Sequence, residues 1–148
     1  MRNISFMLTQ QQVRDRTKTV TRRVGWEKLK NGELLCGVEK GMGLKAGETV
    51  LRLATIQVLT ARREPLRAMI DDLEYGMAEC IKEGFGEHPT LRLPHAFVEF
   101  FCRSHRGCTP DTTLTRIEFG YVEDHVRAVS AASVTTEAAA QVNAGMTA

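Results

Sequence analysis

The sequence lacks long apolar runs, a strong charge excess and internal repeats. No hydrophobic stretch approaches the roughly 20 residues of a membrane-spanning helix, so we expect no membrane partner. The segment from Met1 to Phe6 lacks the apolar core and small-residue cleavage site of a secretory signal, which predicts a cytoplasmic protein. The net charge of +2 is low for a protein that holds a long nucleic-acid duplex.

The cysteines do not form the paired CxxC halves of a zinc ribbon or finger. In a reducing compartment all four are expected as free thiols: Cys36, Cys80, Cys102 and Cys108. One alternative stays open, because Cys102-x-x-His105-x-x-Cys108 supplies three zinc ligands, with His88 or His95 as a fourth. The position of Cys102 in a predicted helix favours a packed thiol, and we predict neither a metal nor a cofactor.

Positive charge is concentrated instead in one short segment, residues 14–23. Its basic side chains are Arg14, Arg16, Lys18, Arg22 and Arg23, against the single acid Asp15. No hydrophobic period explains this segment, and such a run suits the binding of phosphate, carboxylate or a nucleic-acid backbone. Lys18 and Thr21 lie three residues apart, so an extended or turn-like segment can direct an amine and a hydroxyl into a shared cleft.

Alternating apolar residues and glycine turns predict a small, mostly antiparallel barrel with flanking helices, in the α+β class. We expect strands at Asn3–Leu8, Glu33–Val38, Thr49–Thr60 and Thr115–Val122. We expect helices from a Thr9 cap to Arg14 or Asp15, over Asp71–Glu83, and from Pro94 to before Gly107.

The helix predicted over Asp71–Glu83 has the clearest pattern. Asp71 is its expected cap, and apolar side chains recur at Leu73, Met77 and Ile81, which predicts a buried face. Glu79 and Glu83 share a different face. We expect Glu83, at the C-terminal end, to point toward the basic segment.

The segment Thr17-Lys18-Thr19-Val20-Thr21-Arg22 resembles the G-x-K-x-x-T-x-R loop of the ASCH family, a branch of the PUA-like barrels. The family's glycine falls on Arg16. Glu83-Gly84-Phe85 and the run Thr115 to Phe119 are also similar to this family, particularly to its phage and prophage members. The likeness covers residues 3–122.

The resemblance implies action on RNA or a modified nucleoside. Some similar ASCH proteins are amidohydrolases that remove the acetyl group of N4-acetylcytidine, and the motif would make Lys18 the base, Thr21 the nucleophile and Glu83 the carboxylate assisting the leaving amine. Glu79 remains an alternative to Glu83.

A second interpretation is a non-catalytic RNA- or nucleotide-binding module, and a third is a ribonuclease that uses the same basic cleft. In these, ligand contacts would come from the remaining polar side chains of the segment: Arg14, Arg16, Thr19, Arg22 and Arg23. The low net charge favours a nucleoside or a short single strand over a duplex.

The chain length fits one domain. We assign residues 1–124 to this PUA-like domain. Residues 125–148 are dominated by Ala, Ser, Thr and Val with few charges, which predicts a disordered tail or a frayed helix. The sequence leaves the oligomeric state open.

Overall fold

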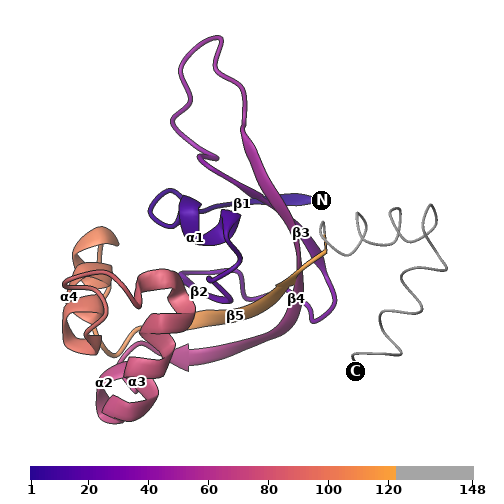
Figure 1. Ribbon diagram of the computed structural model, residues 1–148. Helices are drawn as coiled ribbons and strands as arrows, with labels where there is room; N and C mark the ends of the chain where they lie inside the picture. Colours follow the sequence, from indigo (N-terminus) through magenta and orange to yellow (C-terminus); the bar gives the residue numbers. More distant parts are fainter. Residues whose placement is uncertain (123–148) are drawn as a thin grey trace, which may run out of the picture.

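Five strands form one mostly antiparallel sheet, in the order β1-β3-β4-β5-β2 (Figure 1). The strands are β1 (Arg2–Ser5), β2 (Val20–Arg23), β3 (Leu34–Val38), β4 (Arg52–Pro65) and β5 (Thr113–Tyr121). The β1–β3 pair is parallel, whereas β3–β4, β4–β5 and β5–β2 are antiparallel. This computed structural model describes residues 1–122, and the predicted tail lies outside the described residues.

The sheet is curled, and its two edge strands approach each other without forming a ladder (Figure 1). Arg23 of β2 donates a hydrogen bond from Nη2 to the backbone oxygen of Ser5 in β1, at 2.5 Å. The α+β class and the mostly antiparallel sheet agree with the sequence prediction, but a closed PUA-like barrel is not confirmed. Instead, a side chain bridges the two edges where a closed barrel would have backbone pairing.

The longest strand, β4, begins and ends later than predicted. It runs to Pro65, which pairs with Thr113 at the end of the ladder, where a residue without an N–H group is tolerated. The register with β5 shifts between Val58 and Thr60, which leaves Leu59 as an exposed bulge residue. A bulge of this kind bends the strand, and β4 pairs with β3 in its first part and with β5 in its second part.

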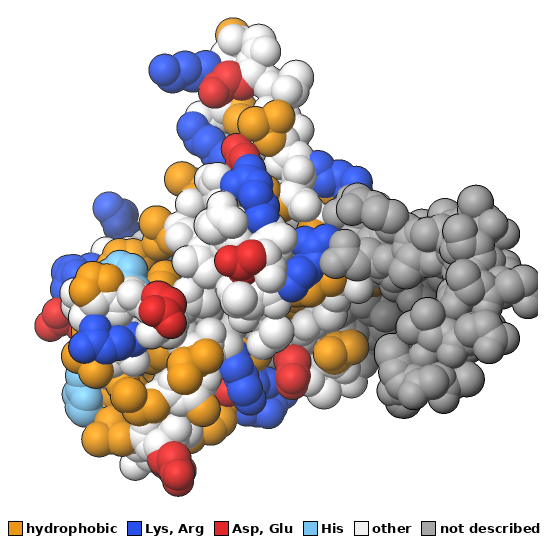
Figure 2. All heavy atoms as spheres, in the orientation of Figure 1, with side chains coloured by type: hydrophobic (Ala, Val, Ile, Leu, Met, Phe, Trp, Pro, Cys, Tyr) orange, Lys and Arg blue, Asp and Glu red, His pale blue; other side chains and the backbone are white. Residues whose placement is uncertain are grey.

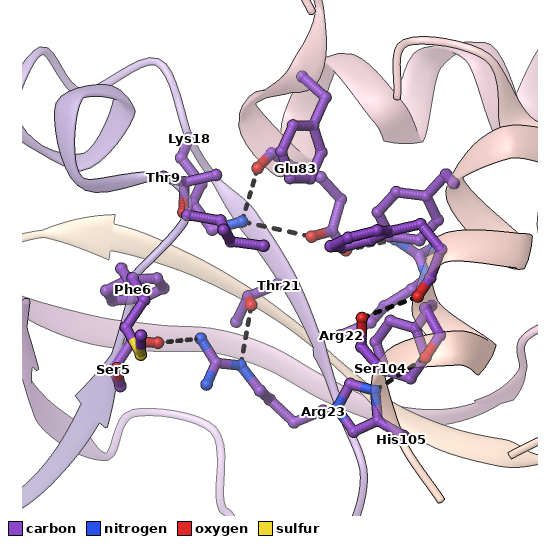
Figure 3. A pocket seen from close by; sticks show the side chains of 16 residues that line it. Ser5, Phe6, Thr9, Lys18, Thr21, Arg22, Arg23, Glu83, Ser104 and His105 are labelled. Atoms are coloured by element: carbon purple, nitrogen blue, oxygen red, sulfur yellow. Dashed lines mark hydrogen bonds and ion pairs between the residues drawn. The ribbon is translucent and has the colours of Figure 1, made fainter. Parts of the chain in front are cut away.

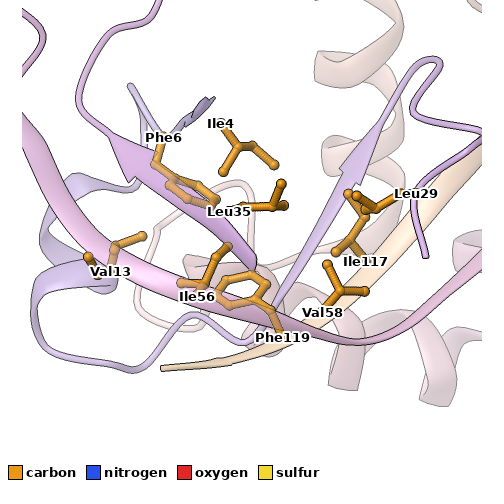
Figure 4. Packing of buried hydrophobic residues seen from close by; sticks show 10 residues of the cluster. Ile4, Phe6, Val13, Leu29, Leu35, Ile56, Val58, Ile117 and Phe119 are labelled. Carbon is orange, nitrogen blue, oxygen red and sulfur yellow. The ribbon is translucent and has the colours of Figure 1, made fainter. Parts of the chain in front are cut away.

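Two hydrophobic clusters lie on opposite faces of the sheet. The cluster on the concave face, shown in Figure 4, contains Ile4, Phe6, Val13, Leu29, Leu35, Ala54, Ile56, Val58, Ile117 and Phe119. The cluster beneath the helices contains Leu66, Met69, Cys80, Phe85, Leu91, Phe97, Val98, Phe101 and Leu114. Strand β5 supplies both, because successive side chains of a strand point to opposite faces.

The helices pack mainly at one end of the sheet (Figure 1). They are α1 (Gln10–Arg14), α2 (Ala68–Asp71), α3 (Leu73–Cys80), a π-helical turn η1 (Ile81–Phe85) and α4 (Pro94–Ser104). Thr9 precedes α1 as predicted, but its side chain makes no capping hydrogen bond. The single helix predicted over Asp71–Glu83 is divided into α3 and η1. Asp72 rather than Asp71 caps α3, because its side chain accepts a hydrogen bond from the Tyr75 N–H.

The buried face of α3 is the opposite of the predicted one. Leu73, Met77 and Ile81 are 51%, 42% and 59% exposed. Glu79 and Glu83 are buried in their place. The prediction of an apolar buried face was wrong because the strands beneath this helix present arginines, which require carboxylates as partners.

Gly84 lies within η1 in a positive-φ conformation, φ 100°, and interrupts the helical geometry there, as glycines near helix C-termini commonly do. Gly76 allows close contact between α3 and its neighbours, because a Cβ atom there would lie 1.9 Å from the backbone oxygen of Met69. These two glycines fix the position of α3 and η1 and, with them, the positions of Glu79 and Glu83.

Candidate functional site

A cavity of about 540 Å³ opens between β1, β2, η1 and α4 (Figure 3). Its polar lining includes Lys18, Thr21, Arg23 and Glu83. Its walls are formed by Ser5, Phe6, Met7, Leu8, Thr9, Arg22, Phe85, Phe97, Phe100, Phe101, Ser104 and His105. The cavity lies where the edge strands β1 and β2 come together.

Lys18 is buried and is held by Glu83. Its Nζ donates to the Glu83 backbone oxygen at 2.6 Å and lies 3.3 Å from Glu83 Oε1. Burial lowers the pKa of Lys18 to about 8, although the charge of Glu83 opposes the shift. About a tenth of this amine is therefore neutral at pH 7, a far larger fraction than for an exposed lysine.

Thr21 and Arg23 form a pair on the cavity side of β2. Because side chains two residues apart share a face of a strand, both point toward the cavity, and Arg23 Nε donates to Thr21 Oγ1 at 3.0 Å. Since Oγ1 accepts this bond, the hydroxyl proton of Thr21 stays available for donation. Within the described part of the chain no hydrogen bond joins Lys18 to Thr21.

Glu83, rather than the alternative Glu79, lines the cavity. Glu83 Oε2 accepts from Arg22 Nη1 at 3.0 Å, so its carboxylate bridges Lys18 and Arg22. Glu79 accepts from Arg116 Nε at 2.6 Å and Nη2 at 3.0 Å, and from Arg22 Nη2 at 2.5 Å. Burial raises the pKa of Glu79, but these arginines lower it more, to about 2. Glu79 thus belongs to the sheet–helix interface.

The sequence placed Arg22 among the residues that contact the ligand. In the structure, however, its side chain points inward and not toward a ligand at the surface. Its side chain is 1% exposed and pairs with three carboxylates: Glu64 at 2.8 Å, Glu79 at 2.5 Å and Glu83 at 3.0 Å. Burial would lower the pKa of Arg22, but the Glu83 charge and the bonds to Glu64 and Glu79 raise it. Arg22 therefore connects strand β2 to α3 and η1 and holds Glu83 in place.

Three further residues of the predicted binding set lie outside the cavity lining. Arg14 pairs with Glu39 at the surface, and Thr19 joins neighbouring elements through its backbone. Arg16 adopts φ 69°, in the left-handed region that favours glycine, and its guanidinium lies 4.8 Å from the ring centre of Tyr121. Arg16 thus has a backbone conformation that is uncommon for a residue with a side chain.

The aromatic walls were missed as site residues. The helical spacing of Phe97, Phe100 and Phe101 is accounted for by core packing alone, and Phe97 and Phe101 do pack in the cluster beneath the helices. The same rings also face the cavity. Phe100 does not belong to the buried stripe of α4, which is formed by Pro94, Phe97, Val98 and Phe101, and in the structure it is half-buried.

The Cys102-x-x-His105-x-x-Cys108 segment does not bring three ligands together. All four cysteines are free thiols, and residues 1–122 hold no group of three or more His, Cys, Asp or Glu side chains arranged for a metal. His105 instead stacks on Phe101, with ring centres 4.1 Å apart, and lines the cavity.

On the face shown in Figure 2, lysine and arginine side chains are interspersed with acidic ones, and hydrophobic side chains gather over the helical end. This face offers no continuous basic stripe for a nucleic-acid backbone. Within residues 1–122, no helix has the length and apolar character required to cross a membrane.

Comparison with known proteins gives little further information. No family model matches the chain, and no curated protein matches it. Among solved structures, the chain is similar to the crystal structure of protein EF3133 from Enterococcus faecalis V583, whose title names the family DUF984. The identity is 19%, the TM-score is 0.46, and the match covers 78% of this chain and 70% of that chain. A likeness at this level assigns no function.

Proposed function

We propose that this protein is an amidohydrolase that removes the acyl group from an N4-acylated cytidine or a similar modified nucleoside. The observation that supports it best is the meeting of Glu83 with Lys18 and Thr21, which come from one distant segment of the chain, at a single cavity. A carboxylate far in sequence from the base and the nucleophile can serve the same reaction only when the fold brings it to them. The resemblance of residues 17–22 and of Glu83-Gly84-Phe85 to the ASCH family points to the same three residues.

The cavity suits a flat aromatic ligand. Ligand sites in proteins commonly enclose about 300–1,000 Å³, with mostly apolar walls and a few converging polar groups. The volume of about 540 Å³ lies in this range, and five phenylalanines contribute to the walls. A pyrimidine ring can pack among these aromatic side chains while its acylamino group reaches Thr21.

The first half of the reaction forms an acyl-enzyme. Neutral Lys18 removes the proton from the Thr21 hydroxyl as Oγ1 forms a bond to the acyl carbon, and the carbonyl electron pair moves to its oxygen. When the carbonyl re-forms, the bond from carbon to the leaving nitrogen breaks. The proton held by Lys18 passes through Glu83 to that nitrogen. Arg23 donates a hydrogen bond to Thr21 Oγ1, and so stabilises the negative charge that develops on Oγ1 as its proton is removed.

The second half restores the enzyme. A water molecule loses a proton to Lys18 and attacks the threonine ester, the bond between the acyl carbon and Oγ1 breaks, and the proton returns to Thr21. The carboxylic acid leaves. Since Lys18 works only when neutral, its lowered pKa is what makes the sequence of steps possible at neutral pH.

The alternative of a non-catalytic nucleoside-binding module uses the same cavity without turnover. A ribonuclease or a phosphate-gripping site has less support, because Arg22 is engaged by internal carboxylates and Arg14 by Glu39. Arg23 also lines the cavity, but its guanidinium already donates to Thr21 Oγ1 and to the backbone oxygen of Ser5.

The test compares Thr21→Val with Thr19→Val. Valine preserves the shape of threonine, and Thr19 lies in the same segment but outside the cavity lining. We expect Thr21→Val to lose about 10³-fold or more in turnover of N4-acetylcytidine with little change in affinity, and Thr19→Val to retain turnover. If Thr21→Val retains wild-type turnover, Thr21 is not the nucleophile. If the wild-type protein binds acylated nucleosides but hydrolyses none of them, the amidohydrolase is refuted and the non-catalytic binding module is retained.

A further inference from the structure

The C-terminal end of α4 forms the side of the cavity opposite Ser5 and Phe6, and it carries two polar residues, Ser104 and His105 (Figure 3). The reaction proposed above uses neither of them. Both make hydrogen bonds within α4 that determine what they can still offer a ligand.

His105 is fixed in one tautomer by its neighbour. Its Nδ1 lies 2.9 Å from the backbone oxygen of Phe101. A carbonyl oxygen can only accept, so Nδ1 carries the proton, and Nε2 of the neutral ring is left as an acceptor. The ring stacks on Phe101 with an interplanar angle of 13°, which holds its orientation.

Ser104 is in a similar position. Its hydroxyl donates to the backbone oxygen of Phe100 at 2.8 Å, so the donor is occupied and the oxygen lone pairs remain. The α4 side of the cavity therefore presents two acceptors whose own donors are already used. Such a surface favours a ligand group that donates hydrogen bonds and disfavours an anion, which can only accept.

We infer that Ser104 and His105 are specificity-determining residues that recognise the vicinal hydroxyls of a ribose. This inference rests on the proposed function, which places the acylamino group at Thr21. With that end of the substrate fixed, the hydrogen-bond donors left on the far side of a ribonucleoside are its sugar hydroxyls. The preferred substrate is then a ribonucleoside, in preference to a dideoxynucleoside or a nucleotide 5′-phosphate.

The experiment measures binding apart from turnover. Calorimetry with the full-length Thr21→Val chain gives affinities for N4-acetylcytidine, its 2′,3′-dideoxy counterpart and its 5′-monophosphate. We expect the ribonucleoside to bind about 5- to 10-fold more tightly than the dideoxy compound, the range expected for hydrogen bonds at a partly exposed site. The monophosphate should bind more weakly than the ribonucleoside.

Adding Ser104→Ala and His105→Phe should bring the ratio of ribonucleoside to dideoxy affinity to within about 2-fold, since the acceptors are removed while a flat ring remains on Phe101. Arg103→Ala is the matched control, because Arg103 lies beside them, pairs with Glu99 and does not line the cavity; the ratio should be unchanged. Ser104→Ala alone should lower the ratio of ribonucleoside to dideoxy affinity partway. Because Ser104 is exposed, this variant should fold and tests the inference even if His105→Phe unfolds the protein.

The inference is overturned if Thr21→Val binds the ribonucleoside and the dideoxy compound equally well, or if their affinity ratio is unchanged by Ser104→Ala and His105→Phe. It is also overturned if the monophosphate binds more tightly than the ribonucleoside, or if neither nucleoside binds. Turnover by the otherwise wild-type chain is read separately. A ribose preference without hydrolysis would refute the amidohydrolase and keep this inference, whereas hydrolysis without a ribose preference would do the reverse.

Discussion

Replacement of Arg22 by methionine should destabilise the fold strongly, because the side chain is buried among three carboxylates. Methionine fills a similar length but removes every ion pair to Glu64, Glu79 and Glu83. Glu79 keeps Arg116, and Glu64 keeps Tyr75 and Arg62, but within residues 1–122 Glu83 is left with Lys18 alone as an ion-pair partner. The cost is thus concentrated on Glu83.

Removing one partner of a buried ion pair typically costs about 3–5 kcal/mol, since the remaining charge is left uncompensated. For a domain of this size that corresponds to a fall in Tm of roughly 10–20 °C. Urea and thermal unfolding of Arg22→Met against wild type measure both quantities.

Arg62→Met is the matched control. Arg62 contacts the same Glu64 at 3.0 Å, but its side chain is 50% exposed, so its loss should cost less than about 1 kcal/mol. Adding Glu83→Gln to Arg22→Met should recover part of the lost stability, because the unpaired charge disappears. If Arg22→Met costs no more than Arg62→Met, the network does not stabilise the fold as described.

Three further predictions concern the same region. Gly76→Ala should lower the unfolding free energy by about 2 kcal/mol or more, measured by urea titration, because its Cβ would overlap the Met69 backbone oxygen; equal stability would show that α2 can move away. The folded-state pKa of Glu79 lies near 2, below its unfolded value, so the stability it contributes is present above about pH 4.3 and is lost as pH falls toward 2; Glu79→Gln should flatten this acid limb of the Tm–pH curve, and an unchanged limb would contradict the assignment. Since Lys18 acts when neutral, kcat/KM for N4-acetylcytidine should rise with pH through an inflection near 8 and be lost in Lys18→Met; a flat profile would remove Lys18 as the base.

Strands β1, β3, β4 and β5 and the last helix could be predicted because local patterns determine them, whereas β2, inside the basic segment, was not predicted as a strand. An apolar run after a turn located β3, period-two alternation located β5, and Pro94 at the start of a helical pattern located α4. The convergence of Lys18 with Glu83 was also predicted, from the ASCH-like motif and the position of Glu83 at the end of a helix. These features depend on neighbours in the sequence or on a motif.

The role of Arg22 could not be predicted in this way. In the sequence it is one of several cations in a basic run, and nothing local distinguishes it from Arg23. The distinction comes from the two faces of β2, since Arg22 points to the helices with Arg116 while Arg23 points to the cavity with Thr21. The face of β2 that is buried against carboxylates depends on how α3 is placed. The apolar pattern of Leu73, Met77 and Ile81 predicted the wrong orientation of α3.

The reversed orientation of α3 has a consequence for how this chain tolerates variation. In an ordinary amphipathic helix, a saturation mutagenesis scan finds the leucine, methionine and isoleucine positions intolerant and the charged positions permissive. Here the profile should be reversed, with Leu73, Met77 and Ile81 accepting polar side chains while Glu79 and Glu83 accept almost none. A designer improving solubility could therefore replace the apolar residues of this helix freely, and random drift would erase them before it changed either carboxylate.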